Sequence, residues 1–96
     1  MPVDDSTTAA IRQACEYAKQ AEGSDRLDDL QDYGGRARTT LESIERSGLD
    51  SSIRHKIEEA IRHAINAQNA SSPDGGQHDA RRVRELINEI LGEPPS

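Results

Sequence analysis

Two histidines and a glutamate are the first side chains in this sequence that could do chemistry. His55, Glu59 and His63 are spaced four apart, so they share one face of a helix, and imidazole and carboxylate groups are common zinc ligands. That face lies opposite a stripe of isoleucines at 53–65, as expected of a solvated polar face. The two histidines are two turns apart, about 12 Å along the axis, too far for one ion unless Glu59 bridges them. We therefore expect no bound metal and no other cofactor.

The single cysteine is the next candidate. Cys15 falls on the apolar face of a helical pattern, where a buried, inert thiol is the ordinary interpretation. The sequence contains no Gly-x-Ser-x-Gly elbow, no phosphate-binding glycine loop and no zincin motif. Gly34-Gly35 lies inside a helical pattern rather than after a strand, so it does not predict a phosphate loop. We expect the protein not to be an enzyme.

A group of acidic residues could act by charge. It stands at the start of a predicted helix and comprises Asp25, Asp28, Asp29 and Asp32. Their favourable interaction with the helix N-terminus is a sufficient explanation of this pattern. The spacing is helical and does not match a calcium-binding loop. The alternative is that these carboxylates form an acidic surface that contacts a basic partner.

A group of arginines could act by positive charge. The candidates for a basic surface are Arg36, Arg38, Arg81, Arg82 and Arg84. The net charge of −6 and the presence of only two aromatic residues, both Tyr, argue against binding to nucleic acid, which needs positive charge and is aided by stacking side chains. Nucleic acid is therefore not an expected partner.

Composition limits what can hold these side chains in place. The chain has 96 residues, enough for one domain, with 32% hydrophobic and 31% charged residues. The strong core formers are eight Ile, six Leu and two Val, with no Phe or Trp, so we expect a sparse core. Apolar runs are too short for a membrane span, and no signal peptide is evident. With a single cysteine, a reducing, cytoplasmic location is the default.

Helical periodicity runs through the whole chain, and no stretch alternates with the period of a strand. Glycines at 23, 48 and 92 end three of the predicted helices. Gly34-Gly35 interrupts the second, and we favour a continuous helix there because the apolar register agrees on both sides. The prediction is an all-α fold, a small antiparallel bundle of three to four helices in one domain. We expect helices at about 7–22, 25–47, 51–69 and 79–91, a loop at 70–78, and short flexible termini.

The apolar stripes suggest a contact surface. The second and fourth predicted helices carry more patterned apolar residues than so small a core needs, so part of each stripe is expected to stay exposed. The side chains expected there are Leu27, Leu30, Tyr33, Val83 and Leu86. This imbalance predicts a protein partner, with a homodimer as one form of it.

Residues 41–91 are similar to a known helical unit. A helix ending in 41–46 is followed by a short turn, a second helix containing 56–65, a loop, and a final helix over 83–91. This order resembles the C-terminal helical lid of DnaK/Hsp70-type chaperones. The chain lacks the nucleotide-binding and substrate-binding domains of that family, so the resemblance implies neither ATPase activity nor a peptide cleft. It implies a helical bundle and an association with chaperones.

The sequence therefore predicts a non-enzymatic helical module for protein–protein interaction or regulation. The alternative is an acidic inhibitor that mimics the charge of nucleic acid on a basic partner, using the four aspartates at 25–32.

Overall fold

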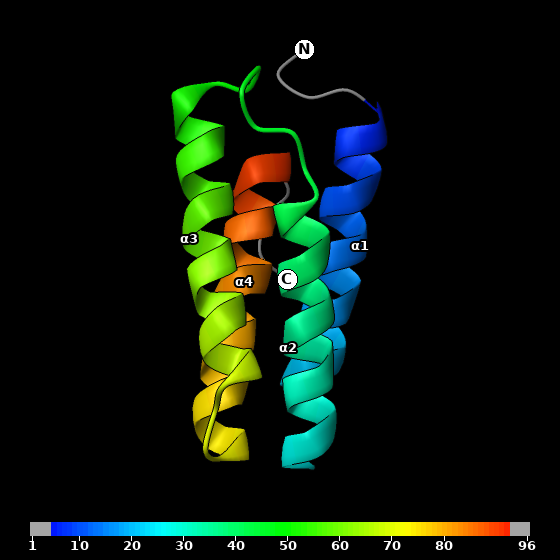
Figure 1. Ribbon diagram of the computed structural model, residues 1–96, viewed down its shortest axis with the longest axis vertical. Helices are drawn as coiled ribbons and strands as arrows, with labels where there is room; N and C mark the ends of the chain where they lie inside the picture. Colours follow the sequence, from blue (N-terminus) through cyan, green and yellow to red (C-terminus); the bar gives the residue numbers. More distant parts are fainter. Residues whose placement is uncertain (1–4, 93–96) are drawn as a thin grey trace.

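The computed structural model describes residues 5–92, which form four helices and no strand. The helices run alternately up and down, so the molecule is an antiparallel bundle, as the sequence predicted (Figure 1). Each helix packs on the next, and α4 also packs on α1 and closes the bundle. The helices are α1 (Asp5–Glu22), α2 (Leu27–Glu42), α3 (Ser51–Gln68) and α4 (Pro73–Leu91).

Small side chains make up much of the core. Of its buried hydrophobic residues, eight are alanines and eight are Ile, Leu or Val. Alanine contributes little burial, but it allows two helix axes to approach closely. The larger side chains fill the remaining space, and the biggest that are fully buried include Ile11, Leu41 and Ile57.

Helix α2 is continuous through Gly34-Gly35, in agreement with the register argument. Gly34 lies against the end of α3, where a Cβ atom at this position would stand 2.9 Å from the backbone nitrogen of Gln68 and 3.0 Å from the Cβ of Ala67. The missing side chain therefore lets α2 and α3 approach at this level, which offsets the cost of a glycine inside a helix.

The second helix ends earlier than predicted, at Glu42 rather than at residue 47. Local hydrogen bonds explain the difference. The hydroxyl of Ser43 donates to the carbonyl of Thr40, and the carboxylate of Glu45 accepts from both the backbone N–H and the hydroxyl of Ser47. Such bonds offer the backbone an alternative to further helical turns. Ile44 nevertheless stays buried.

The fourth helix begins earlier than predicted, at Pro73 rather than at residue 79, so most of the expected 70–78 loop is helical. Ser72 has extended backbone angles and its Oγ accepts from the N–H of Gly75, as an N-cap does. Pro73 occupies the first helical turn, where no N–H is needed. Gly76 is buried beneath Leu30, where a larger side chain would collide. Gly76 therefore serves packing, not a turn.

The other helix boundaries lie closer to the predicted ones. α1 begins at Asp5, two residues before the predicted start, and α3 ends at Gln68. Gly92 caps α4 with a φ of 73°, the left-handed conformation that glycine adopts easily. The predicted flexible termini fall mostly outside the described residues. Within 5–92, no helix combines the length and apolar character that crossing a membrane requires.

Candidate functional site

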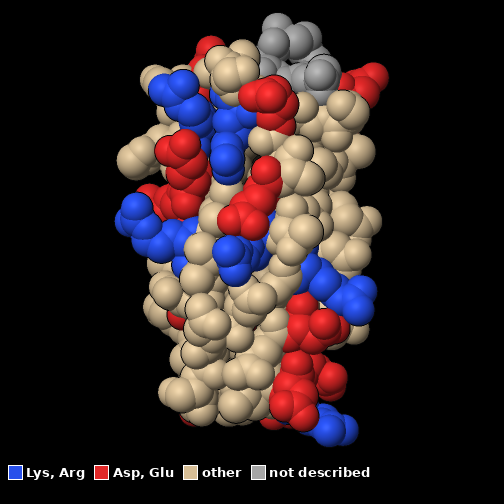
Figure 2. All heavy atoms as spheres, viewed as in Figure 1, with Lys and Arg blue, Asp and Glu red and all other residues tan. Residues whose placement is uncertain are grey.

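The acidic residues lie together at the N-terminal end of α2. Asp25 precedes the helix, Asp28 and Asp29 are in its first turn, and all three side chains are exposed. None of the three has a hydrogen bond or ion pair within residues 5–92. Figure 2 shows carboxylates gathered along the lower part of α2. Asp32, one turn further, is also exposed but pairs with Arg36 at 3.0 Å.

The two aromatic rings of the chain stack between α1 and α2. Tyr17 and Tyr33 have ring centroids 6.5 Å apart with an angle of 29° between their planes. Both rings are half-buried, and so is Leu27 at the start of α2. These residues present part of their surface near the acidic end of α2 but form no large apolar patch.

The prediction that Leu30, Val83 and Leu86 form an exposed contact surface is wrong. All three side chains are buried, with at most 2% of their surface accessible. Leu30 packs on Gly76, while Val83 and Leu86 belong to the main core cluster. The alanine-faced helix α1 covers α4, so the core encloses more of the apolar stripes than the sequence suggested. No Ile, Leu or Val of residues 5–92 is fully exposed.

The arginines do not form a free basic surface, because each candidate has a carboxylate partner. On α2, Arg36 pairs with Asp32, and Arg38 pairs with Glu42 at 3.3 Å and donates to the side-chain oxygen of Gln68. The charge of Asp32 raises the pKa of Arg36 further above its ordinary value. These exposed pairs contribute little stability but neutralise the cations locally.

A more protected pair connects the two helices that are furthest apart in sequence. Arg84 on α4 donates two hydrogen bonds to Glu22 at the end of α1, at 2.8 and 3.3 Å, and Arg81 donates a third at 3.3 Å. The bond from Arg84 is the main reason that the pKa of Glu22 lies below its ordinary value. The same contact raises the pKa of Arg84. The arrangement clamps α4 to α1.

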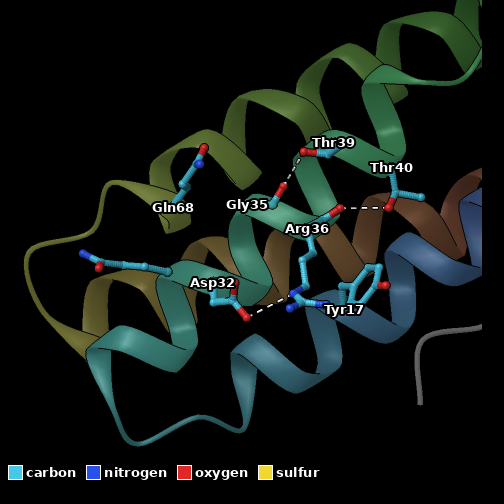
Figure 3. A pocket seen from close by; sticks show the side chains of 8 residues that line it. Tyr17, Asp32, Gly35, Arg36, Thr39, Thr40 and Gln68 are labelled. Carbon is cyan, nitrogen blue, oxygen red and sulfur yellow. Dashed lines mark hydrogen bonds and ion pairs between the residues drawn. The ribbon is translucent and has the colours of Figure 1, made fainter.

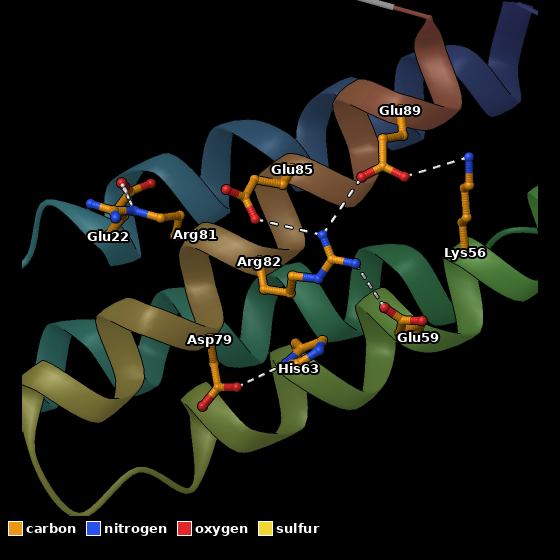
Figure 4. A network of polar contacts seen from close by, with 9 residues as sticks. All are labelled: Glu22, Lys56, Glu59, His63, Asp79, Arg81, Arg82, Glu85 and Glu89. Atoms are coloured by element: carbon orange, nitrogen blue, oxygen red, sulfur yellow. Dashed lines mark hydrogen bonds and ion pairs between the residues drawn. The ribbon is translucent and has the colours of Figure 1, made fainter. Parts of the chain in front are cut away.

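A network of charges connects α4 to α3 (Figure 4). Arg82 is its centre, with the carboxylate of Glu59 at 3.2 Å and those of Glu85 and Glu89 at 3.6 Å each. Lys56 extends the network from α3 to Glu89 at 3.5 Å. Every group in it has an opposite charge nearby, so the network holds two helices together and presents no net cationic surface.

The histidine–glutamate group of α3 is divided among different partners. His63 lies 2.9 Å from Asp79 on α4, and Glu59 pairs with Arg82, while His55 is exposed. Among residues 5–92 no three His, Cys, Asp or Glu side chains are placed to hold a metal ion. Cys15 is buried on the inner face of α1.

An open depression of about 410 Å³ lies over the outer face of α2 (Figure 3). Gly35 lies at its centre, with Gln68 of α3 on one side and Tyr17 of α1, together with the Asp32–Arg36 pair, on the other. Gln31, Thr39 and Thr40 complete the lining. The surface is polar and has no unbalanced charge.

Sequence reasoning did not identify this depression or the Glu22 clamp. The clamp joins residues 62 positions apart, and no local pattern predicts which carboxylate an arginine will reach over that separation. A local sequence pattern could have indicated the depression. Gln31, Gly35 and Thr39 are spaced four apart, so a bare glycine stands between polar side chains on one outer face.

Comparisons of the chain with protein-family models, with curated proteins and with solved structures found no match. The similarity of residues 41–91 to the chaperone lid therefore stays a prediction from the sequence.

Proposed function

We propose that this protein is a non-enzymatic helical module that binds a basic surface of a partner protein through the acidic end of α2. The proposal rests on a contrast between the acidic and the basic side chains. The side chains of Asp25, Asp28 and Asp29 are exposed and unpaired within residues 5–92, whereas all five candidate arginines are neutralised by carboxylates. The positive end of the α2 dipole stabilises these carboxylates without covering them. Three carboxylates that are available to a partner therefore lie close together at the start of α2.

Charge also favours a different partner over a second copy of this chain. The homodimer predicted from the sequence requires an uncovered apolar face, and Leu30, Val83 and Leu86 are buried within the single chain. A second copy would also carry a net charge of −6 and would bring like charges together. The single, buried cysteine is in keeping with a cytoplasmic setting for this role.

Capture from a native extract tests the proposal. The bait is the wild-type chain or a variant with Asp25→Asn, Asp28→Asn and Asp29→Asn. The matched control is Asp5→Asn, Asp50→Asn and Glu58→Gln, which removes the same charge from exposed positions at the start of α1, before α3 and on α3. The start of α1 and the start of α3 lie at the opposite end of the bundle from the start of α2 (Figure 1).

We expect wild type and control to retain the same basic proteins at about 0.05 M salt and to release them at about 0.5 M, because salt screens exposed charges. The triple aspartate variant should fail to retain them. Retention that is equal in all three baits, or that resists 0.5 M salt, would contradict the proposal.

A second candidate function is supported by the spacing of the carboxylates. Asp28, Asp29 and Asp32 lie in the first two turns of α2, Asp25 comes just before it, and all four side chains are exposed. Such a row can occupy a site that otherwise holds nucleic-acid phosphates, so the protein would act as a charge mimic. This version predicts that the captured partner binds DNA or RNA and that added protein displaces the nucleic acid. A partner without nucleic-acid affinity would rule it out.

A further inference from the structure

Two glutamine side chains in the depression over Gly35 each use only one end of the amide, the NH₂ group in Gln31 and the carbonyl oxygen in Gln68. The Nε2 of Gln31 donates to the carbonyl of Ala70 at 2.8 Å, which fixes this amide and leaves its Oε1 without a donor among residues 5–92. The Oε1 of Gln68 accepts from Arg38 at 2.9 Å, which leaves its Nε2 without an acceptor in the same part of the chain. The depression therefore holds one fixed acceptor and one fixed donor, from two helices.

Gly35 makes room beside this donor. A Cβ atom at this position would lie 3.0 Å from the Nε2 of Gln68 and 3.4 Å from its Cδ, so any side chain would crowd the amide. Figure 3 shows Gln68 beside Gly35, with the Asp32–Arg36 pair and Tyr17 across the depression. The bare backbone at residue 35 gives a ligand access to the surface between them.

The chemistry of the lining selects a neutral ligand with both a donor and an acceptor. Asp32 and Arg36 neutralise each other, so neither an anion nor a cation is favoured by charge. The remaining groups are amides and hydroxyls, and those of Thr39 and Thr40 already donate to the backbone of α2. A peptide main chain carries the complementary N–H and C=O groups along its length.

We propose that the depression binds the main chain of an extended peptide segment, which donates an N–H to the Oε1 of Gln31 and accepts with a C=O from the Nε2 of Gln68. This inference rests on the proposed function, since it names the kind of partner segment that a protein-binding module would hold. It adds a contact that does not depend on charge. High salt weakens binding at the acidic end of α2 but not this contact, so the two can be measured separately.

Nuclear magnetic resonance titration with a neutral blocked peptide, N-acetylglycylglycine N-methylamide, tests the proposal in about 0.5 M NaCl. The signals followed are the side-chain amides of Gln31 and Gln68 and the backbone amide of Gly35. We expect these signals to shift together and to saturate at millimolar peptide, the affinity expected of a few hydrogen bonds. An analogue with the central amide replaced by an ester, which lacks that N–H, should bind about threefold to tenfold more weakly.

Gly35→Ala should weaken peptide binding by a similar factor, because the added methyl group crowds Gln68. Gly48→Ala is the matched control, since a Cβ at that exposed position meets nothing within 4 Å, and it should bind as wild type does. Absence of saturable shifts in wild type, or equal binding by Gly35→Ala, would overturn the proposal. Propionamide that binds as tightly as the peptide would show a site for single amides and would also overturn it. None of these results depends on the aspartate variants.

Discussion

Glu22 shows how one side chain can hold two distant parts of the chain together. Its side chain is 22% exposed and that of Arg84 is 17% exposed, so their two hydrogen bonds are shielded more than those of the surface pairs on α2. Charge-assisted bonds with two parallel contacts are among the stronger polar interactions in proteins. We therefore expect Glu22 to contribute measurably to stability.

Replacing Glu22 with Gln should lower the free energy of unfolding by about 1–2 kcal/mol at pH 7. Hydrogen bonds to charged groups contribute about 1.5–3 kcal/mol, and the partial exposure of this pair reduces that contribution. The pKa of Glu22 is lowered in the folded state from 4.5, so the unfolded chain binds a proton more readily. The stabilisation is therefore fully present above the unfolded pKa and is lost as the pH falls through the folded one. Urea unfolding at several pH values measures both effects.

Glu42→Gln is the control for that experiment. Glu42 and Arg38 are 44% and 38% exposed, and such pairs contribute about 0–1 kcal/mol. We expect Glu42→Gln to lower the free energy of unfolding less than Glu22→Gln does. If Glu22→Gln costs no more than Glu42→Gln at pH 7, or if its cost is the same at pH 3, the clamp does not stabilise the bundle.

Residue-scale prediction from sequence succeeded only where the cause was local. The aspartates at the start of α2 were expected near a helix N-terminus, and Asp28 and Asp29 are there. Glu59, the nearest partner of Arg82, and Glu22, the partner of Arg84, lie on other helices, 23 and 62 residues away. Their pairing depends on how the helices are placed around the core, which residue type and spacing do not specify.

Adjacent glycines of α2 should respond in opposite ways to the same substitution. At Gly34 an added Cβ meets the backbone nitrogen of Gln68 at 2.9 Å, so α2 and α3 would have to move apart. At Gly35 it meets only a side chain, which can move. We expect Gly34→Ala to lower the free energy of unfolding by about 1–3 kcal/mol, as overpacking does. Thermal unfolding followed by circular dichroism measures the change.

Gly35→Ala should leave that free energy unchanged or raise it by up to about 1 kcal/mol, because alanine favours a helix more than glycine does. The two variants differ by one position and add the same methyl group, so each controls for the other. Equal destabilisation by both would show that the close approach of α3 does not set Gly34 apart from Gly35.

At the scale of elements, the apolar periodicity predicted the four helices well, whereas the glycine, proline and capping residues predicted the helix ends less well. The apolar register across Gly34-Gly35 correctly indicated a continuous helix. The run after Ser72 was wrongly interpreted as a loop because it contains Pro73 and two glycines. Ser-Pro-Asp is also a start signal, with an N-cap, a proline in the first turn and an acidic residue near the dipole. Packing of Gly76 under Leu30 favours the helical alternative, and a single helix cannot reveal that contact.

At the scale of the whole molecule, the hydrophobic core contains few large side chains. Half of the buried Ala, Ile, Leu and Val side chains are alanines, so most of the hydrophobic stabilisation comes from eight larger ones. The sequence correctly indicated that these are few. It led to a wrong expectation for Leu30, Val83 and Leu86, because their burial depends on how four helices close around one another.

A core with so few large side chains should be sensitive to the loss of any one of them. Ile57 is fully buried in the central cluster, and Ile57→Ala should lower the free energy of unfolding by about 2–5 kcal/mol. Small domains have only about 5–15 kcal/mol in total, so part of the variant population should be unfolded at moderate temperature. Ile65→Ala on the same helix is the matched control, because Ile65 is half-buried and lies outside that cluster. Chemical denaturation of both variants should therefore give a clearly larger loss at residue 57, and equal losses would mean that the bundle does not depend on its central layer.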